Sequence, residues 1–336
     1  MSIIPTRAAA SDTGQRTPSG GRLGVGTMAG IGVLAGLSSA VLTLIGQARS
    51  ATRSIEALAV EAALADGTLV PPAVPGGRAQ QRLADHLVHV RLPQGDGVYS
   101  PDGTLLDPPP SQADVATDAP APLTLVMLGD STSVGYGTRS ADELPGVILA
   151  RGVAAATNRL VRMRSHGLTG ARTSDLPRQL ELCLADQPDI VVILIGGNDM
   201  RDMVPPWRSA ALLGNAVATL TARGIPVVAG SCPDFGVITA IPQPLRSLLS
   251  GWSLRLAALQ ERAVVEAGGA AVALARLVSP QFVGNPEMFA RDHFHPSGAG
   301  YGRAMAVLLP ALISELDGRR ATGTDQIAAE PGQLSA

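Results

Sequence analysis

The residues best suited to chemistry in this chain are one serine and, far downstream, a histidine and an aspartate. Ser131 lies in Gly-Asp-Ser after an apolar run, and Asp292-His-Phe-His295 precedes a proline. A serine hydroxyl is a weak nucleophile until a base accepts its proton, and an aspartate can orient the histidine that acts as that base. These residue types predict nucleophilic serine chemistry.

Two further segments supply hydrogen-bond donors that such chemistry needs. One is His166-Gly-Leu-Thr-Gly170, and the other is Gly196-Gly-Asn198-Asp, which follows a run of aliphatic residues. The tetrahedral intermediate of acyl transfer carries an oxyanion, which backbone N–H groups and asparagine amides stabilise. Gly170 and Asn198 are therefore candidate donors.

Strands and helices are expected to alternate from Leu123 onward, which predicts a parallel sheet covered on both faces. The fold class is α/β, a three-layer α/β/α sandwich with a five-stranded parallel sheet. The strands are expected at 123–128, 160–165, 189–195, 225–230 and 270–275, and the helices at 141–159, 174–186, 208–223, 244–267 and 297–316. Ligands of such sheets bind beyond the carboxyl ends of the strands, where all the candidate residues are expected to lie.

Each of these motifs also has an ordinary structural interpretation. Gly-Asp-Ser is a common turn, and a serine after a strand is often a helix cap. Gly-Gly-Asn-Asp can be a tight turn, and Asp292-x-x-His295-Pro a loop bridged by its own side chains. Their occurrence in this order, all at one edge of the expected sheet, favours a catalytic site.

These motifs together resemble those of the SGNH (GDSL-type) serine hydrolases, over residues 123 to about 315. The resemblance implies the flavodoxin-like fold of that family, with Ser131 as nucleophile, His295 as general base and Asp292 as the acid that orients it. It also implies an oxyanion hole made of the backbone N–H groups of Ser131 and Gly170 and the side-chain amide of Asn198.

The chain departs from the family pattern at three positions. Thr132 stands where the name of the motif has leucine, His166 lies where an asparagine is usual, and His293 is a second histidine beside the expected one. The α/β-hydrolase fold is the nearest alternative, but its members carry Gly-x-Ser-x-Gly, whereas this chain has Ser133 where the last glycine would be. We expect His293 to have no direct role.

Composition argues against several other classes of function. The net charge is −2 and no basic stripe is apparent, so no nucleic-acid partner is expected. No phosphate-binding loop or metal-ligand spacing occurs, so neither a cofactor nor a metal is predicted. Cys183 and Cys232 are expected to be packing residues, although Cys232 follows a strand.

The N-terminal part suggests a membrane segment. Residues 23–48 carry no charge and, as a helix, would span roughly 39 Å, more than the ~30 Å bilayer core. The expected organisation is a tail (1–22), a transmembrane anchor or signal segment (23–48), a short helix and Pro/Gly-rich stalk (49–122), the hydrolase domain (123–318) and a disordered tail (319–336). An anchor would leave the catalytic domain membrane-bound and extracytoplasmic, whereas a cleaved signal peptide would give a secreted enzyme.

The predicted function is a serine esterase that hydrolyses carboxylic esters through an acyl-enzyme. Two alternatives stay open: a catalytically silent, membrane-tethered binding module of the same fold, and a carbohydrate O-acetyl esterase. The segments 200–207 and 234–241 are largely apolar and are expected to wall the pocket, which favours a small aliphatic acyl ester as substrate. The oligomeric state is left open.

Overall fold

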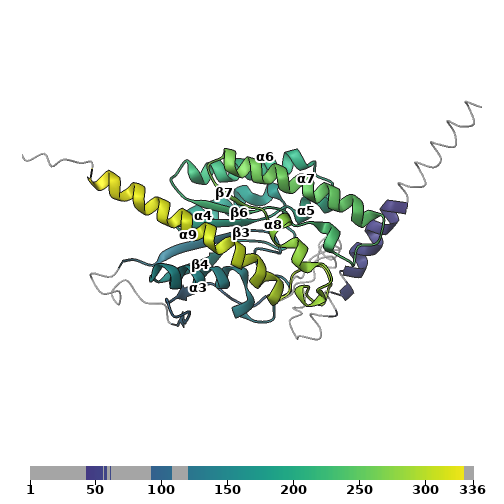
Figure 1. The fold of residues 1–336 in the computed structure, drawn as a ribbon, viewed down its shortest axis with the longest axis horizontal. Coiled ribbons are helices and arrows are strands. Elements are labelled where there is room, and N and C mark those ends of the chain that lie inside the picture. Colours follow the sequence, from purple (N-terminus) through teal and green to yellow (C-terminus); the bar gives the residue numbers. More distant parts are fainter. Residues whose placement is uncertain (1–42, 56, 59–60, 62–91, 108–119, 329–336) are drawn as a thin grey trace, which may run out of the picture. The chain divides into compact units, whose positions relative to one another are not determined.

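The computed structural model describes residues 43–55, 57, 58, 61, 92–107 and 120–328 (Figure 1). The chain divides into two compact units, Met1–Gly46 and Gln47–Ala336. Of the first unit only residues 43–46 are described, in a helical segment that runs to residue 55. The fold presented below is therefore that of the second unit.

Seven strands form one mixed sheet in the order β2-β1-β4-β3-β5-β6-β7. The five strands from β3 to β7 run parallel to one another, and β1 pairs antiparallel with both β4 and β2. The bounds are β1 (Gly97–Tyr99), β2 (Leu105–Leu106), β3 (Leu123–Gly129), β4 (Val161–Ser165), β5 (Ile190–Leu194), β6 (Val227–Gly230) and β7 (Ala270–Val272). The five parallel strands and the α/β class agree with the sequence analysis.

The expected sheet of five strands was incomplete, because β1 and β2 lie in the range 49–122 that was assigned to a helix and stalk. They form a hairpin around Ser100-Pro-Asp-Gly103, a sequence typical of turns. Val98 and Tyr99 are nearly inaccessible to solvent, and the Tyr99 hydroxyl donates to the carbonyl oxygen of Gly95 at 2.7 Å. The antiparallel pairing of β1 with β4 extends the sheet, and burial of these two side chains stabilises the added strand.

Helices cover both faces of the sheet, which gives three layers (Figure 1). α3 and α9 share one hydrophobic cluster with the sheet, and α4, α6 and α7 contribute to a second. The bounds are α3 (Pro145–Thr157), α4 (Leu176–Ala185), α5 (Gly197–Arg201), α6 (Pro206–Thr221), α7 (Leu245–Glu266), α8 (Leu274–Leu277) and α9 (Gly298–Ala328).

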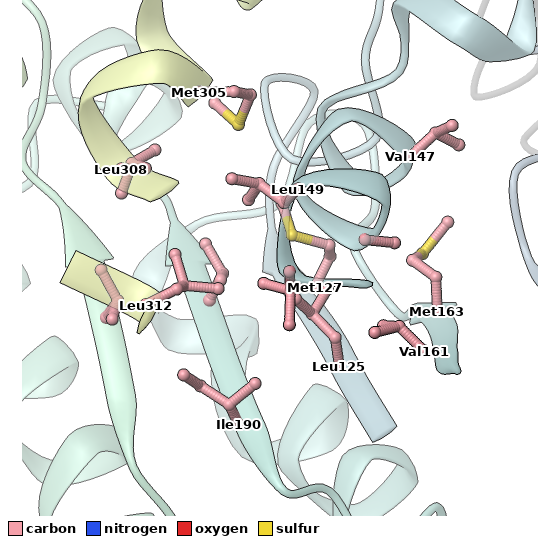
Figure 2. Close-up of a cluster of buried hydrophobic side chains, with 14 of the residues drawn as sticks. Leu125, Met127, Val147, Leu149, Val161, Met163, Ile190, Met305, Leu308 and Leu312 are labelled. Atoms are coloured by element: carbon pink, nitrogen blue, oxygen red, sulfur yellow. The ribbon is translucent and has the colours of Figure 1, made fainter. Parts of the chain in front are cut away.

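The alternation of side chains along β3 divides the core into these two clusters. Leu125 and Met127 pack with α3 and α9, as Figure 2 shows, whereas Val126 and Leu128 belong to the opposite cluster. All four are inaccessible to solvent. Successive side chains of a strand point to opposite faces, so an uninterrupted apolar strand requires a layer of helices on each side.

The sequence predicts a disordered tail at the C-terminus and a membrane anchor near the N-terminus. α9 continues to Ala328, into the range 319–336 that was expected to be disordered. The predicted anchor, 23–48, lies outside the described residues except for 43–48. Within the part of the chain that the structure describes, no helix is both long and apolar enough to cross a membrane.

The order of the central strands fixes where a site can form. The chain leaves β3 toward β4 on one side and later returns to β5 on the other, so the loops after β3 and β5 diverge. A crevice at such a switch point is where open α/β sheets bind their ligands. Ser131 and Asn198 follow the two strands that border it.

Candidate active site

A sharp turn at the end of β3 presents Ser131. Gly129 adopts a φ of +136°, and a Cβ atom there would lie 1.8 Å from the carbonyl oxygen of Leu194. The N–H of Asp130 donates to that same carbonyl at 3.0 Å. The close approach of β3 and β5 therefore requires glycine, and it brings the serine to the edge of the sheet.

Ser131, His295 and Asp292 form a continuous chain of hydrogen bonds. His295 Nε2 lies 3.0 Å from Ser131 Oγ, and His295 Nδ1 lies 2.6 Å from Asp292 Oδ2. With its proton on Nδ1, the imidazole donates to Asp292 and accepts from the serine hydroxyl. This tautomer leaves Nε2 free to take the serine proton.

The environment of Asp292 keeps it ionised. Only 2% of the residue is exposed, and its Oδ1 accepts from the N–H groups of Phe294 and His295 at 3.0 and 2.9 Å. Burial by itself raises the pKa of this carboxyl, but the bond and charge of His295 together with the two backbone donors lower the pKa below its ordinary value. The carboxylate can therefore orient the imidazole and stabilise its charged form.

Aromatic rings flank the imidazole of His295. The ring of Tyr136 lies 4.4 Å from it between centroids, and Phe294 meets it edge-on at 5.0 Å. Phe294 in turn packs edge-on against Phe235. Burial, together with the charge of Asp292, raises the pKa of Tyr136 to about 12, so this neighbour of the histidine is neutral.

The two candidate donors lie in segments that touch each other. Asn198 is in the first turn of α5, and its Nδ2 donates to the carbonyl oxygen of Ala171 at 3.0 Å, which leaves its second amide hydrogen for another acceptor. Gly170 has a φ of +84°, and a Cβ there would meet nothing within 4 Å. Position 170 therefore favours glycine because of its backbone conformation, and not because a neighbouring atom lies too close.

Other residues singled out from the sequence lie apart from this chain of bonds. His293 is exposed, with a φ of +54° in the turn between Asp292 and Phe294. His166 Nε2 pairs with Asp186 Oδ2 at 2.5 Å. Cys232 is buried against Met200, and burial raises the pKa of its thiol.

Several buried polar residues that the sequence analysis did not single out hold these segments in place. The side-chain amide of Gln179, on α4, accepts from the N–H of Gly129 and donates to its carbonyl, at 2.7 and 2.9 Å. Gln260, on α7, likewise bonds the backbone at the ends of β5 and β6. One signal in the sequence could have identified these two residues. Each is a glutamine on the apolar face of a helix, and a buried amide requires hydrogen-bond partners.

Asp130 joins the turns after β3 and β5. Its carboxylate accepts from the N–H of Thr132 at 2.9 Å and from the backbone of Gly196. It is fully buried, and this burial raises its pKa above the ordinary value. Among the described residues, no group of three or more His, Cys, Asp or Glu side chains is arranged to hold a metal ion.

The chain is similar in sequence to a known protein family and to a known esterase. Residues 127–303 match the model of the GDSL-like Lipase/Acylhydrolase family. The GDSL-like esterase Rv1075c of Mycobacterium tuberculosis is 39% identical over 243 residues, which cover 71% of this chain and 76% of that protein.

Solved structures with a similar fold are more distant in sequence. TesA is 20% identical, with 57% of this chain and 99% of TesA covered and a TM-score of 0.47. The lipase/acylhydrolase from Enterococcus faecalis is 21% identical, with 56% and 94% covered and a TM-score of 0.45.

Proposed function

Because the chain belongs to the GDSL-like lipase/acylhydrolase family and is a hydrolase of ester bonds, we propose that it is a serine esterase acting through an acyl-enzyme. Ser131 is the nucleophile, His295 the general base and then acid, and Asp292 the residue that orients His295. The observation that carries this proposal is the unbroken series of hydrogen bonds from Ser131 Oγ through the imidazole to Asp292.

The reaction proceeds in two halves. His295 Nε2 takes the hydroxyl proton as Ser131 Oγ attacks the ester carbonyl, and the oxyanion forms against the N–H groups of Ser131 and Gly170 and the amide of Asn198. Collapse of this intermediate expels the alcohol, which receives the proton from His295. Water then attacks the acyl-serine with His295 again as base, which releases the acid and restores the serine.

Reaction with a fluorophosphonate tests the nucleophile. We expect the probe to inactivate the enzyme and to add its mass to the peptide that contains Ser131, since an activated serine attacks phosphorus as it attacks a carbonyl. The variant Ser131→Ala should remain folded, stay unlabelled and lose hydrolysis of p-nitrophenyl acetate. Labelling at another residue would contradict the assignment of Ser131. The absence of labelling in a fully folded protein would favour a silent binding module.

We further propose that the acyl group of the substrate is aliphatic. The segment after α5 carries two exposed apolar side chains, Met203 and Trp207, which are 63% and 67% exposed. In contrast, Phe235, Ile238 and Ile241 of the second expected wall are buried in a cluster with Met200, and contribute packing behind the site. A series of p-nitrophenyl esters of increasing chain length tests this, since a decline from acetate onward would favour an acetyl esterase.

The charge-free run 23–48 supports a second proposal, that the full-length protein is anchored in a membrane with its catalytic domain extracytoplasmic. Carbonate extraction of the membrane fraction tests it, because salt and alkali do not disrupt burial of apolar residues in the bilayer. A mature N-terminus near Ala51 would instead identify a cleaved signal peptide and a secreted enzyme.

A further inference from the structure

The two proposed oxyanion donors outside the nucleophile turn belong to strands that do not pair. Gly170 follows β4 and Asn198 follows β5, and β3 lies between these strands in the sheet. No ladder hydrogen bond therefore connects the donor segments. Both strands pair with β3, so the sheet sets the separation of the two segments only through a third strand. Since an oxyanion hole requires its donors at a fixed separation, an interaction that joins the segments directly would fix that distance more closely.

Asp199 and Thr173 provide such an interaction. Asp199 directly follows Asn198, and Thr173 lies three positions after Gly170, at the start of the 3-10 helix η2 (Thr173–Asp175). The carboxylate of Asp199 accepts from the Thr173 N–H at 3.0 Å and from its hydroxyl at 2.6 Å. The bond from Asn198 to the carbonyl of Ala171 completes a bridge between the two segments.

We propose that the Asp199–Thr173 pair is a positioning device for the oxyanion hole, which holds the Gly170 N–H and the Asn198 amide in register across β3. This inference rests on the esterase function proposed above. Asp199 and Thr173 are the positioning residues, and neither touches the substrate.

The burial of the pair is what suits it to this role. Asp199 and Thr173 are 1% and 0% exposed, and the hydroxyl of Ser209 on α6 lies 3.4 Å from Thr173 Oγ1. Hydrogen bonds between groups shielded from water are electrostatically stronger than exposed ones. Loss of the threonine hydroxyl would leave one carboxylate oxygen without its partner and free the donor segments to separate.

An exposed ion pair joins the same two segments and serves as a control, although Asp202 also pairs with its neighbour Arg201. Arg172 Nη1 lies 3.3 Å from Asp202 Oδ2, but the side chains are 45% and 30% exposed. Exposed pairs of this kind contribute little to stability or geometry because water screens them. Asp202→Asn should therefore leave turnover within about twofold of the wild type.

The test compares Thr173→Val with Thr173→Ser. Valine keeps the volume and removes the hydroxyl, and we expect kcat to fall about 10- to 100-fold with KM changed less than about threefold, since small displacements of catalytic groups have effects of this size. Serine keeps the hydroxyl and should retain kcat within about threefold. In an Asn198→Ala background the effect of Thr173→Val should become smaller, because one of the donors that it positions is absent.

Three outcomes would overturn the proposal: a folded Thr173→Val enzyme with normal kcat, a defect confined to KM, or a loss in Thr173→Ser equal to that in Thr173→Val. If Thr173→Val does not fold, Asp199→Asn, which removes the charge and keeps the size, is expected to lower kcat in the same way. The activity of Ser131→Ala distinguishes failure of the positioning role from failure of the esterase mechanism. If this variant is inactive while Thr173→Val is normal, only the positioning role fails, whereas an active Ser131→Ala enzyme refutes the esterase mechanism itself.

Discussion

The loop that carries Asp292 and His295 and the segments that carry Ser131, Gly170 and Asn198 are held in different ways. In the loop, most of the ordering contacts join residues close in sequence. Asp292 accepts from the backbone two and three positions ahead, Ala290 N–H donates to the carbonyl of His295, and Ser297 N–H donates to that of Met288. Most of the contacts that position the proposed acid and base thus lie within one short stretch of chain.

The nucleophile and donor segments depend instead on buried side chains from distant parts of the sequence. Gln179 bonds the backbone of Gly129, Gln260 bonds the backbone at the ends of β5 and β6, and Asp199 bonds Thr173. Each of these interactions joins elements that the chain order separates. Their geometry requires the sheet and the layer of helices that includes α4 and α7 to be in place.

The difference teaches that the proposed active site combines a half that depends on local sequence and a half that depends on tertiary packing. Substitutions in the acid–base loop should lower the catalytic rate with little effect on the stability of the fold. Substitutions among the buried polar groups should act through the geometry of the donors and through stability. The predictions below test this division, starting with the largest effect.

The acid–base loop is expected to give the largest losses of activity. His295→Ala removes the proton acceptor, and Asp292→Ala removes only its orientation, so kcat should fall by at least about 10⁴-fold in both, with the histidine variant at least as impaired. The measurement is kcat and KM for p-nitrophenyl acetate, alongside circular dichroism to verify folding.

His293→Ala is the matched control for the loop, because His293 is exposed and makes no bond to Ser131 or Asp292 among the contacts of the described residues. It should keep most activity, with some loss of stability because its φ is positive. An essential His293 beside a dispensable His295 would show that the motif has been assigned in the wrong register.

An intermediate effect is expected from the donor segments. Asn198→Ala removes one donor that acts on the transition state, so kcat should fall by about 10²- to 10³-fold with a modest change in KM. Steady-state kinetics across several substrate concentrations separate the two constants. A defect chiefly in KM would assign Asn198 to substrate binding and remove it from the oxyanion hole.

The smallest effects are opposite responses of the two halves to pH. Asp292 has a pKa lowered below its ordinary value of 3.8, so its contribution to stability is present above about pH 4 and is lost as the pH falls through the folded-state pKa. Asp130 has a pKa raised by burial, so the unfolded state ionises first and the folded protein loses stability as the pH rises from about 4 through the folded-state pKa.

Thermal unfolding of Asp292→Asn and Asp130→Asn against the wild type, over a series of pH values, measures these responses. The Tm of the wild type, measured relative to that of Asp292→Asn, should fall as the pH is lowered below about 4. Relative to that of Asp130→Asn, it should fall as the pH rises above about 4. Equal slopes in the two comparisons would show that the two aspartates do not experience different environments.

Much of the fold was accessible from the sequence because it depends on local patterns. The apolar runs of the five parallel strands and the long helices between them appear close to where they were expected. The last strand, however, ends at Val272 and not at residue 275, and the short helices α5 and α8 were not expected. The strand order places β4 and β5 on either side of β3, as in the flavodoxin-like arrangement that the resemblance implies. The hairpin of β1 and β2 was missed because it is short and lies among prolines and glycines.

The sequence by itself determined those parts of the candidate site that depend on a few consecutive residues. These are the glycine turn before Ser131, the Asp292-x-x-His295 spacing and the glycine at position 170. Only the tertiary structure decided that Thr173 would meet Asp199, that Gln179 would bond Gly129, and that β1 would extend the sheet. Backbone turns follow from local conformational preference, whereas a buried polar side chain finds its partner only when packing brings together segments that the chain order keeps apart.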